Sequence, residues 1–176
     1  MKTIKYFTTL FTLLLVFAAT AQTTKDEKII KDAEKAKMTL LKTDEGLKTF
    51  FDNSAGYVLF PNVGKGGFIV GASSGNGVVY ENGKKVGMAD LKKLNIGLQA
   101  GGQSIIEVIF FENEADLSEF KEGNFNFAAE ASAVAVKSGL AFNAKYKDGV
   151  AVFALPKAGL MADASVGGQK FSYHPF

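Results

Sequence analysis

The sequence of 176 residues contains no cysteine, no tryptophan and no arginine, and it has one histidine and three prolines. The absence of cysteine excludes disulfides and a lipid anchor attached to cysteine. Because every basic residue is a lysine, the bidentate contacts that arginine makes with bases and phosphates are unavailable. The single histidine leaves no cluster with metal-ligand spacing. We therefore expect no metal, no cofactor, no nucleic-acid partner and no enzymatic activity.

The beginning of the chain has the features of a secretory signal peptide. Lys2 and Lys5 precede an apolar run over residues 7–17, and Ala19-Thr20-Ala21 fits the small-x-small cleavage site. We predict a signal peptide over residues 1–21 and export to the periplasm or cell envelope. The alternative is a retained anchor, but the apolar run is short for the roughly 20 residues that span a bilayer. Since the formal net charge is +2, removal of these two lysines leaves a neutral mature chain.

Residues 22–176 have the length of one domain, and no proline-rich or serine-rich linker divides them. Apolar residues at Ile29, Ala33, Ala36 and Leu40 follow helical spacing and predict a helix over residues 25–41. Thr43 is the expected N-cap of a second helix that turns Leu47, Phe50 and Phe51 inward. A third short helix is predicted near residues 114–122, with Asn113 as its cap and Gly123 at its end.

The rest of the domain shows short strand patterns separated by turn residues. Asn82-Gly83 and Asp148-Gly149 are hairpin turns, because these residue types tolerate positive φ. Strands are expected over residues 57–60, 67–73, 77–81, 84–88, 105–111, 125–135, 140–146, 150–155, 159–166 and 169–173. The predicted fold is α+β, with a strongly curved or barrel-like, mostly antiparallel β-sheet and an N-terminal helical segment.

A glycine-rich stretch, residues 97–104, precedes the strand expected at 105–111. Glycine is normally rare inside strands, so Gly97, Gly101 and Gly102 predict a bend or a close approach of another backbone. Gln99 and Gln103 are expected to be structural hydrogen-bonding residues in the same motif. The alternative is that this stretch forms a loop.

Residues with chemical potential are few. Residues 62–67 resemble a phosphate loop superficially, but no Ser or Thr follows Lys65 and no helix opens there. Glu107 and Glu130 lie in apolar surroundings without a spacing that connects them, and we interpret them as members of buried networks. His174 lies next to the C-terminus and is expected to be an exposed residue at the end of a strand.

Two sets of residues are candidates for contact with a membrane. Lys65, Lys84, Lys85, Lys92 and Lys93 are candidates for lipid headgroups, since each lysine near an anionic surface contributes about 1 kcal/mol. Some of these lysines have an alternative role as gatekeepers on an edge strand. Ile29, Ile30, Leu40 and Leu41 are candidates for membrane contact by the first helix, and core packing is the competing role of this face.

Several segments in order resemble the SYLF-domain family of lipid-binding proteins. They are residues 56–61, 64–68, 77–80, 97–104, 109–111, 149–153, 159–161 and 168–171. The resemblance covers nearly all of the expected mature chain and implies a single SYLF-like lipid-binding domain over residues 22–176. It also implies phospholipid binding, notably of phosphoinositides in eukaryotic members, and actin binding in some fungal relatives.

The leading hypothesis is a noncatalytic, exported protein that binds anionic phospholipids at an envelope membrane. Export does not favour actin as a partner. One alternative is a carrier that encloses an apolar ligand within the curved sheet. Another is a structural or interaction protein of the envelope.

Overall fold

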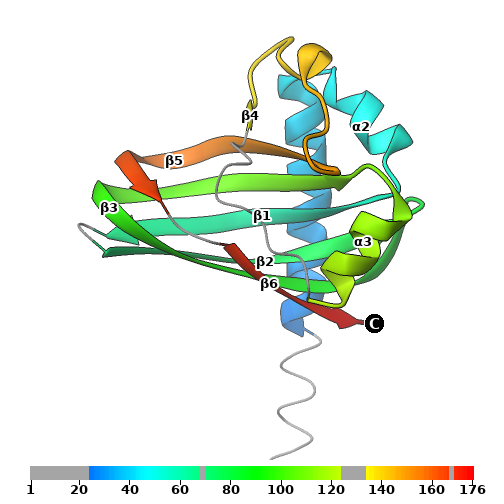
Figure 1. Ribbon diagram of the computed structural model, residues 1–176, viewed down its shortest axis with the longest axis horizontal. Coiled ribbons are helices and arrows are strands. Elements are labelled where there is room, and N and C mark those ends of the chain that lie inside the picture. Colours follow the sequence, from blue (N-terminus) through cyan, green and yellow to red (C-terminus); the bar gives the residue numbers. More distant parts are fainter. Residues whose placement is uncertain (1–23, 68–69, 124–133, 167–168) are drawn as a thin grey trace, which may run out of the picture.

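The computed structural model describes residues 24–67, 70–123, 134–166 and 169–176, and these form one sheet with helices packed against it (Figure 1). The first helix occupies residues 24–43. The other helices are α2 (Leu47–Asn53), α3 (Glu114–Lys121) and the 3-10 turn η1 (Ala141–Asn143). The strands are β1 (Gly56–Gly67), β2 (Val70–Glu81), β3 (Lys84–Phe111), β4 (Val134–Ala135), β5 (Val150–Val166) and β6 (Gln169–Pro175). The α+β class and the mostly antiparallel sheet are confirmed, with β4–β5 as a parallel pair.

Strand β3 reverses its direction within the glycine-rich stretch. Residues 84–96 pair antiparallel with β2, residues 101–111 pair antiparallel with β1, and β1 and β2 are antiparallel to each other. The two halves of β3 must therefore run in opposite directions, and Figure 1 shows β3 curving round the end of the β1–β2 hairpin. The predicted bend is confirmed. The loop alternative is wrong, because residues 96–111 pair with β5.

The sheet is curved but open. Its strand order ends at β4 on one side, and on the other side β6 pairs with the first half of β3. No pairing joins β4 to β6 among the described strands, so the barrel-like closure is not confirmed. Strand β4 has two residues and offers too short a ladder to close the sheet.

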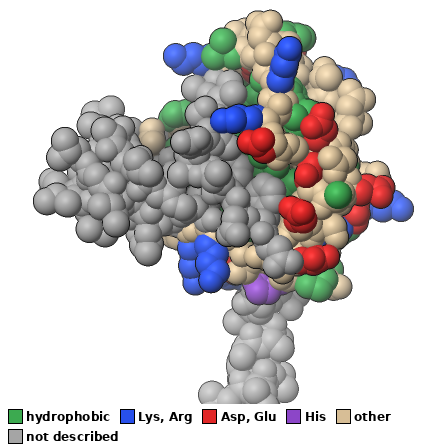
Figure 2. Space-filling view, in the orientation of Figure 1, with side chains coloured by type: hydrophobic (Ala, Val, Ile, Leu, Met, Phe, Trp, Pro, Cys, Tyr) green, Lys and Arg blue, Asp and Glu red, His purple; other side chains and the backbone are tan. Residues whose placement is uncertain are grey.

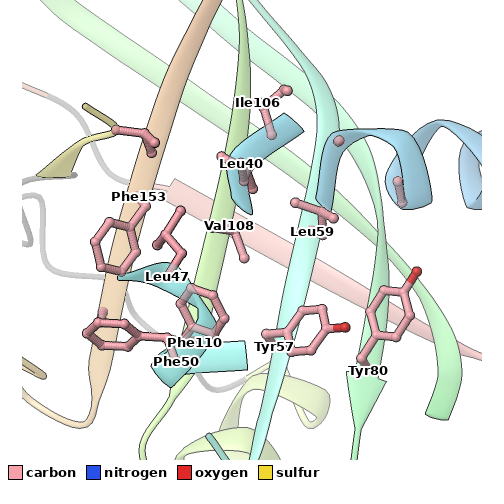
Figure 3. Packing of buried hydrophobic residues seen from close by; sticks show 14 of the residues in the cluster. Leu40, Leu47, Phe50, Tyr57, Leu59, Tyr80, Ile106, Val108, Phe110 and Phe153 are labelled. Carbon is pink, nitrogen blue, oxygen red and sulfur yellow. The ribbon is translucent and has the colours of Figure 1, made fainter. Parts of the chain in front are cut away.

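One face of the sheet is covered by the first helix and α2. Ala33, Ala36 and Leu40 are at most 4% exposed and pack in the same cluster as Leu47 and Phe50. Figure 3 shows these helices over aromatic and aliphatic side chains of the sheet, among them Tyr57, Leu59, Val108, Phe110 and Phe153. The apolar face of the first helix thus forms part of the core.

The opposite face packs against α3 and β6. The ring of Phe120 in α3 lies 5.1 Å from that of Phe111 and 5.4 Å from that of Phe171 in β6. Phe60 completes this group of buried rings, with its centroid 6.1 Å from that of Phe171. Burial of each phenylalanine side chain stabilises the folded state by about 1.5–3 kcal/mol. This second cluster holds the edge strand β6 against the body of the domain.

Several strand boundaries predicted from turn residues are wrong. Strand β1 continues through Pro61, because a β-bulge between Leu59 and Val63 accommodates a residue without an N–H group. Strand β2 runs through residues 74–76, because they pair with both β1 and β3. Within the described residues, β1 and β2 are therefore longer than the turn residues predict.

The start of the second helix also differs from the prediction. Thr43 ends the first helix, where its Oγ1 donates to the Thr39 carbonyl at 2.8 Å, and Gly46 is the N-cap of α2. The buried Asp44 supplies the polar contact instead, since its Oδ1 accepts a hydrogen bond from the Gly46 N–H at 3.0 Å. The inward positions of Leu47 and Phe50 are confirmed, and Phe51 is partly buried.

The predicted local signals hold at three other places. Asn82 and Asp148 adopt positive φ, at 49° and 50°, and each is followed by a glycine with positive φ. The Asn113 side chain accepts a hydrogen bond from the Asp116 N–H and caps α3.

The prediction of a strand over residues 140–146 is wrong, because this segment contains the 3-10 turn η1. Three predictions lie outside the described residues. They are the signal peptide, Glu130, and residues 125–133 of the strand predicted over residues 125–135.

Candidate functional site

The five lysine candidates do not form one patch. Lys84 and Lys85 lie at the start of β3, and Lys92 and Lys93 lie eight residues further along the same strand, a separation of about 26 Å at roughly 3.3 Å per residue. Lys85 forms an ion pair with Glu34, with Nζ and Oε1 2.9 Å apart. The backbone register places Lys65 opposite Ser73, and Ser73 opposite Lys93. The candidates thus occupy two ends of the sheet.

The structure adds Lys170 to one of these ends. Lys92 in β3 and Lys170 in β6 are directly opposite each other, and both are exposed. Neither forms an ion pair with a described residue. Like charges in this position destabilise a strand pair. Sequence reasoning missed this pair because the register of β6 against β3 depends on distant parts of the chain.

The helix candidates for membrane contact are used by the core. Leu40 is 0% exposed, and Ile29, Ile30 and Leu41 are partly buried against the same cluster. Within the described residues, the helices are too short or too polar to cross a bilayer.

A different segment combines exposed apolar side chains with lysines, and we call residues 137–147 the η1 segment. Its Leu140 and Phe142 are 45% and 69% exposed. Lys137 precedes them, Lys145 and Lys147 follow them, and all three are exposed. The segment contains no acidic residue. It therefore presents apolar surface and positive charge together, beyond the β4 edge of the sheet (Figure 1).

Asp44 fixes the position of the η1 segment. Its Oδ2 accepts a hydrogen bond from the Ala141 N–H at 2.8 Å, while its Oδ1 binds the Gly46 N–H. The backbone at Gly46 lies so close to the η1 segment that a Cβ atom at this position would be 2.8 Å from the Phe142 nitrogen. A single buried carboxylate thus joins the turn before α2 to η1, although 97 residues separate Asp44 from Ala141.

A cleft of about 470 Å³, the α2–η1 cleft, opens between these two elements. Its apolar lining includes Phe50, Ala141, Phe142 and Ala144. Its charged lining consists of Glu112 and Lys145, and Tyr146, Thr49 and Asn53 add polar groups. Phe142 also borders a second cleft of about 650 Å³, which contains the Lys48–Asp52 ion pair. The most exposed aromatic residue of the segment therefore stands between two hollows.

The electrostatics of the α2–η1 cleft centre on Glu112 and Tyr146. Burial raises the pKa of Tyr146 to about 12, and the nearby Glu112 carboxylate acts in the same direction. A tyrosine hydroxyl is neutral at physiological pH in any case, so Tyr146 can donate a hydrogen bond. The sequence predicts a strand in this region, although Ser138-Gly139 is a local turn signal and Gly139 adopts a positive φ of 82°.

The residues with chemical potential form structural contacts. The Nε2 atom of His174 lies 3.1 Å from Oδ2 of Asp90, whose other oxygen accepts a hydrogen bond from Asn76. Glu107 is 2% exposed. Lys37 donates to the Tyr57 hydroxyl at 3.0 Å, and burial lowers the pKa of this lysine. In the part of the chain that the structure describes, no three metal-ligating side chains gather.

Comparisons with known proteins agree with the resemblance. Residues 92–174 match the model of the Ysc84 family, described as Las17-binding protein actin regulator. This match includes the whole bend of β3, the η1 segment and β6 up to His174. The chain is also 30% identical over 142 residues to Beta cell expansion factor A of Aeromonas veronii, a match that covers 79% of this chain and 53% of the relative. The chain thus spans about half the length of this curated relative. The predicted resemblance is thus confirmed for residues 92–174, which carry a Ysc84 (SYLF) domain.

Proposed function

We propose that this protein is a noncatalytic phospholipid-binding domain that associates with a membrane of the cell envelope after export. The observation that carries the proposal is the η1 segment, in which Leu140 and Phe142 are exposed between Lys137 and the pair Lys145 and Lys147. The lipid-binding property that the family resemblance implies supports the same function.

The proposed mode of binding has an apolar and an electrostatic part. Phe142 and Leu140 enter the boundary between headgroups and acyl chains, where burial of a large apolar side chain is worth about 1.5–3 kcal/mol. The three lysines meet anionic headgroups, at about 1 kcal/mol each. Stable attachment to a membrane needs both the apolar and the electrostatic contribution, because a protein with only one of them binds reversibly and weakly.

Other functions find less support in the described residues. The rings of Phe60, Phe111, Phe120 and Phe171 fill the side of the sheet that faces α3, where a carrier would enclose its ligand. We do not extend actin regulation, which the family description names, to this chain, because we expect it to be exported.

Sedimentation with vesicles tests the proposal. The mature protein is expected to pellet with vesicles that contain phosphatidylglycerol at low salt. The double variant Leu140→Ser/Phe142→Ser should bind at least about tenfold more weakly, since it loses the apolar contribution. Phe176→Ser is the matched control, because Phe176 is 66% exposed at the other edge of the sheet. Absence of binding to every mixture, or unchanged binding of the double variant, would contradict the proposal.

A further inference from the structure

The α2–η1 cleft contains two charges of opposite sign that have no described ion-pair partner. Glu112 and Lys145 both line the cleft and both are exposed. The ion pairs formed by described side chains involve other residues. The cleft thus presents one carboxylate and one ammonium group, in contrast to the purely basic charge of the η1 segment around it.

The neighbours of Glu112 favour a donor-bearing cation. The neutral Tyr146 hydroxyl lies close enough for the Glu112 carboxylate to affect its ionisation. A primary ammonium group carries three N–H donors and can satisfy a carboxylate and a phenol oxygen together. A purely anionic headgroup would instead be repelled by Glu112.

The apolar lining favours a lipid over a soluble zwitterion. Phe50, Ala141, Phe142 and Ala144 contribute apolar surface beside the two charges. The volume of about 470 Å³ falls in the usual range of roughly 300–1,000 Å³ for small-molecule sites. Phe142 lines the cleft and is also exposed on the surface that is proposed to face the bilayer.

We propose that the α2–η1 cleft binds one zwitterionic aminophospholipid, with its ammonium group at Glu112, its phosphate at Lys145 and its acyl chains along Phe142. This inference rests on the proposed function, and it names the lipid class that the site selects. Anionic lipids are attracted to the lysines of the η1 segment, whereas a single aminophospholipid is held in the cleft.

The test uses dihexanoyl phosphatidylethanolamine below its micelle concentration, titrated into the mature protein and followed by NMR. We expect it to bind more tightly than dihexanoyl phosphatidylglycerol. Glu112→Gln should weaken its binding about tenfold, because a charge-assisted hydrogen bond is lost, and should leave phosphatidylglycerol binding unchanged or stronger. Glu119→Gln is the matched control, because Glu119 is an exposed glutamate on α3.

A second variant blocks the cleft instead of changing its charge. Ala144→Phe should reduce phosphatidylethanolamine binding at least about tenfold, and its chemical-shift spectrum reports whether the fold is kept. O-phosphoethanolamine alone should bind much more weakly, and equal binding would overturn the lipid assignment. Equal affinity for the two lipids, or binding unaffected by Glu112→Gln, would overturn the inference. Sedimentation with vesicles of phosphatidylglycerol and phosphatidylcholine, which lack this lipid, tests the proposed function separately.

Discussion

The two edges of the sheet differ in how they present charge and apolar surface. At the β6 edge, a regular strand of seven residues brings Lys170 opposite Lys92, and its apolar Phe171 points into the core. At the β4 edge, a strand of two residues gives way to the η1 segment, whose Leu140 and Phe142 are exposed. A regular strand alternates its side chains between solvent and core, so a phenylalanine beside exposed lysines is buried.

A short irregular turn is not bound by this alternation. It can expose a phenylalanine and flank it with lysines on the same surface. Figure 2 shows lysines above and below acidic side chains on the visible face, so positive charge alone does not single out one edge. The combination of apolar and basic groups, rather than the lysines themselves, therefore distinguishes the candidate site.

The largest effect is expected from removing the apolar anchor of the β6 edge. Phe171 is 4% exposed and contacts the rings of Phe60 and Phe120. Phe171→Ala should lower the free energy of unfolding by about 3–5 kcal/mol, measured by urea denaturation. Phe176→Ala, at an exposed position on the same edge, should change it by less than about 0.5 kcal/mol. A small effect of Phe171→Ala would mean that β6 is not integrated in the core.

The next effect concerns the carboxylate that holds the β4 edge. Asp44→Ala removes hydrogen bonds to the N–H groups of Gly46 and Ala141. We expect a loss of about 2–3 kcal/mol in the free energy of unfolding, with weaker vesicle binding because η1 is released. Asp44→Asn keeps one acceptor oxygen and should lie between the wild type and Asp44→Ala. Full vesicle binding by Asp44→Ala would show that η1 need not be fixed.

The smallest expected effect is on vesicle binding. It compares two double variants that each lose two positive charges, one in the η1 segment and one at the β6 edge. Lys137→Gln/Lys147→Gln should weaken binding to anionic vesicles by about 2 kcal/mol, since each lysine contributes about 1 kcal/mol. Lys92→Gln/Lys170→Gln should change vesicle binding little, and relief of like-charge repulsion should raise the free energy of unfolding by about 0.2–1 kcal/mol. If the second pair instead shows the larger loss of binding, headgroups are bound at the β6 edge.

Local signals in the sequence predicted the elements that local chemistry determines. The spacing of Ala33, Ala36 and Leu40 specified a helix with a buried face, and Asn82 and Asp148 specified turns through positive φ. The glycine-rich stretch predicted a bend, since only small residues tolerate such a reversal beside another strand. These features depend on residues close in the chain.

Several errors arose where distant segments override a local preference. Residues 74–76 look like a turn but pair on both sides, and Pro61 is accommodated by a bulge. The 140–146 region was predicted as a strand, whereas contact with Asp44 fixes a 3-10 turn there. The candidate site was missed for the same reason, because exposure of Phe142 depends on what packs around it.

The resemblance to the family, the first helix and the bend of β3 were all predictable, because glycine content, helical spacing and motif order are properties of the chain. Three features were not predictable in this way: the burial of the apolar face of the first helix, the separation of the five candidate lysines into two groups, and the exposure of Leu140 and Phe142. Burial and proximity depend on contacts between residues far apart in the sequence, and the Asp44 carboxylate that joins positions 97 residues apart is the clearest case.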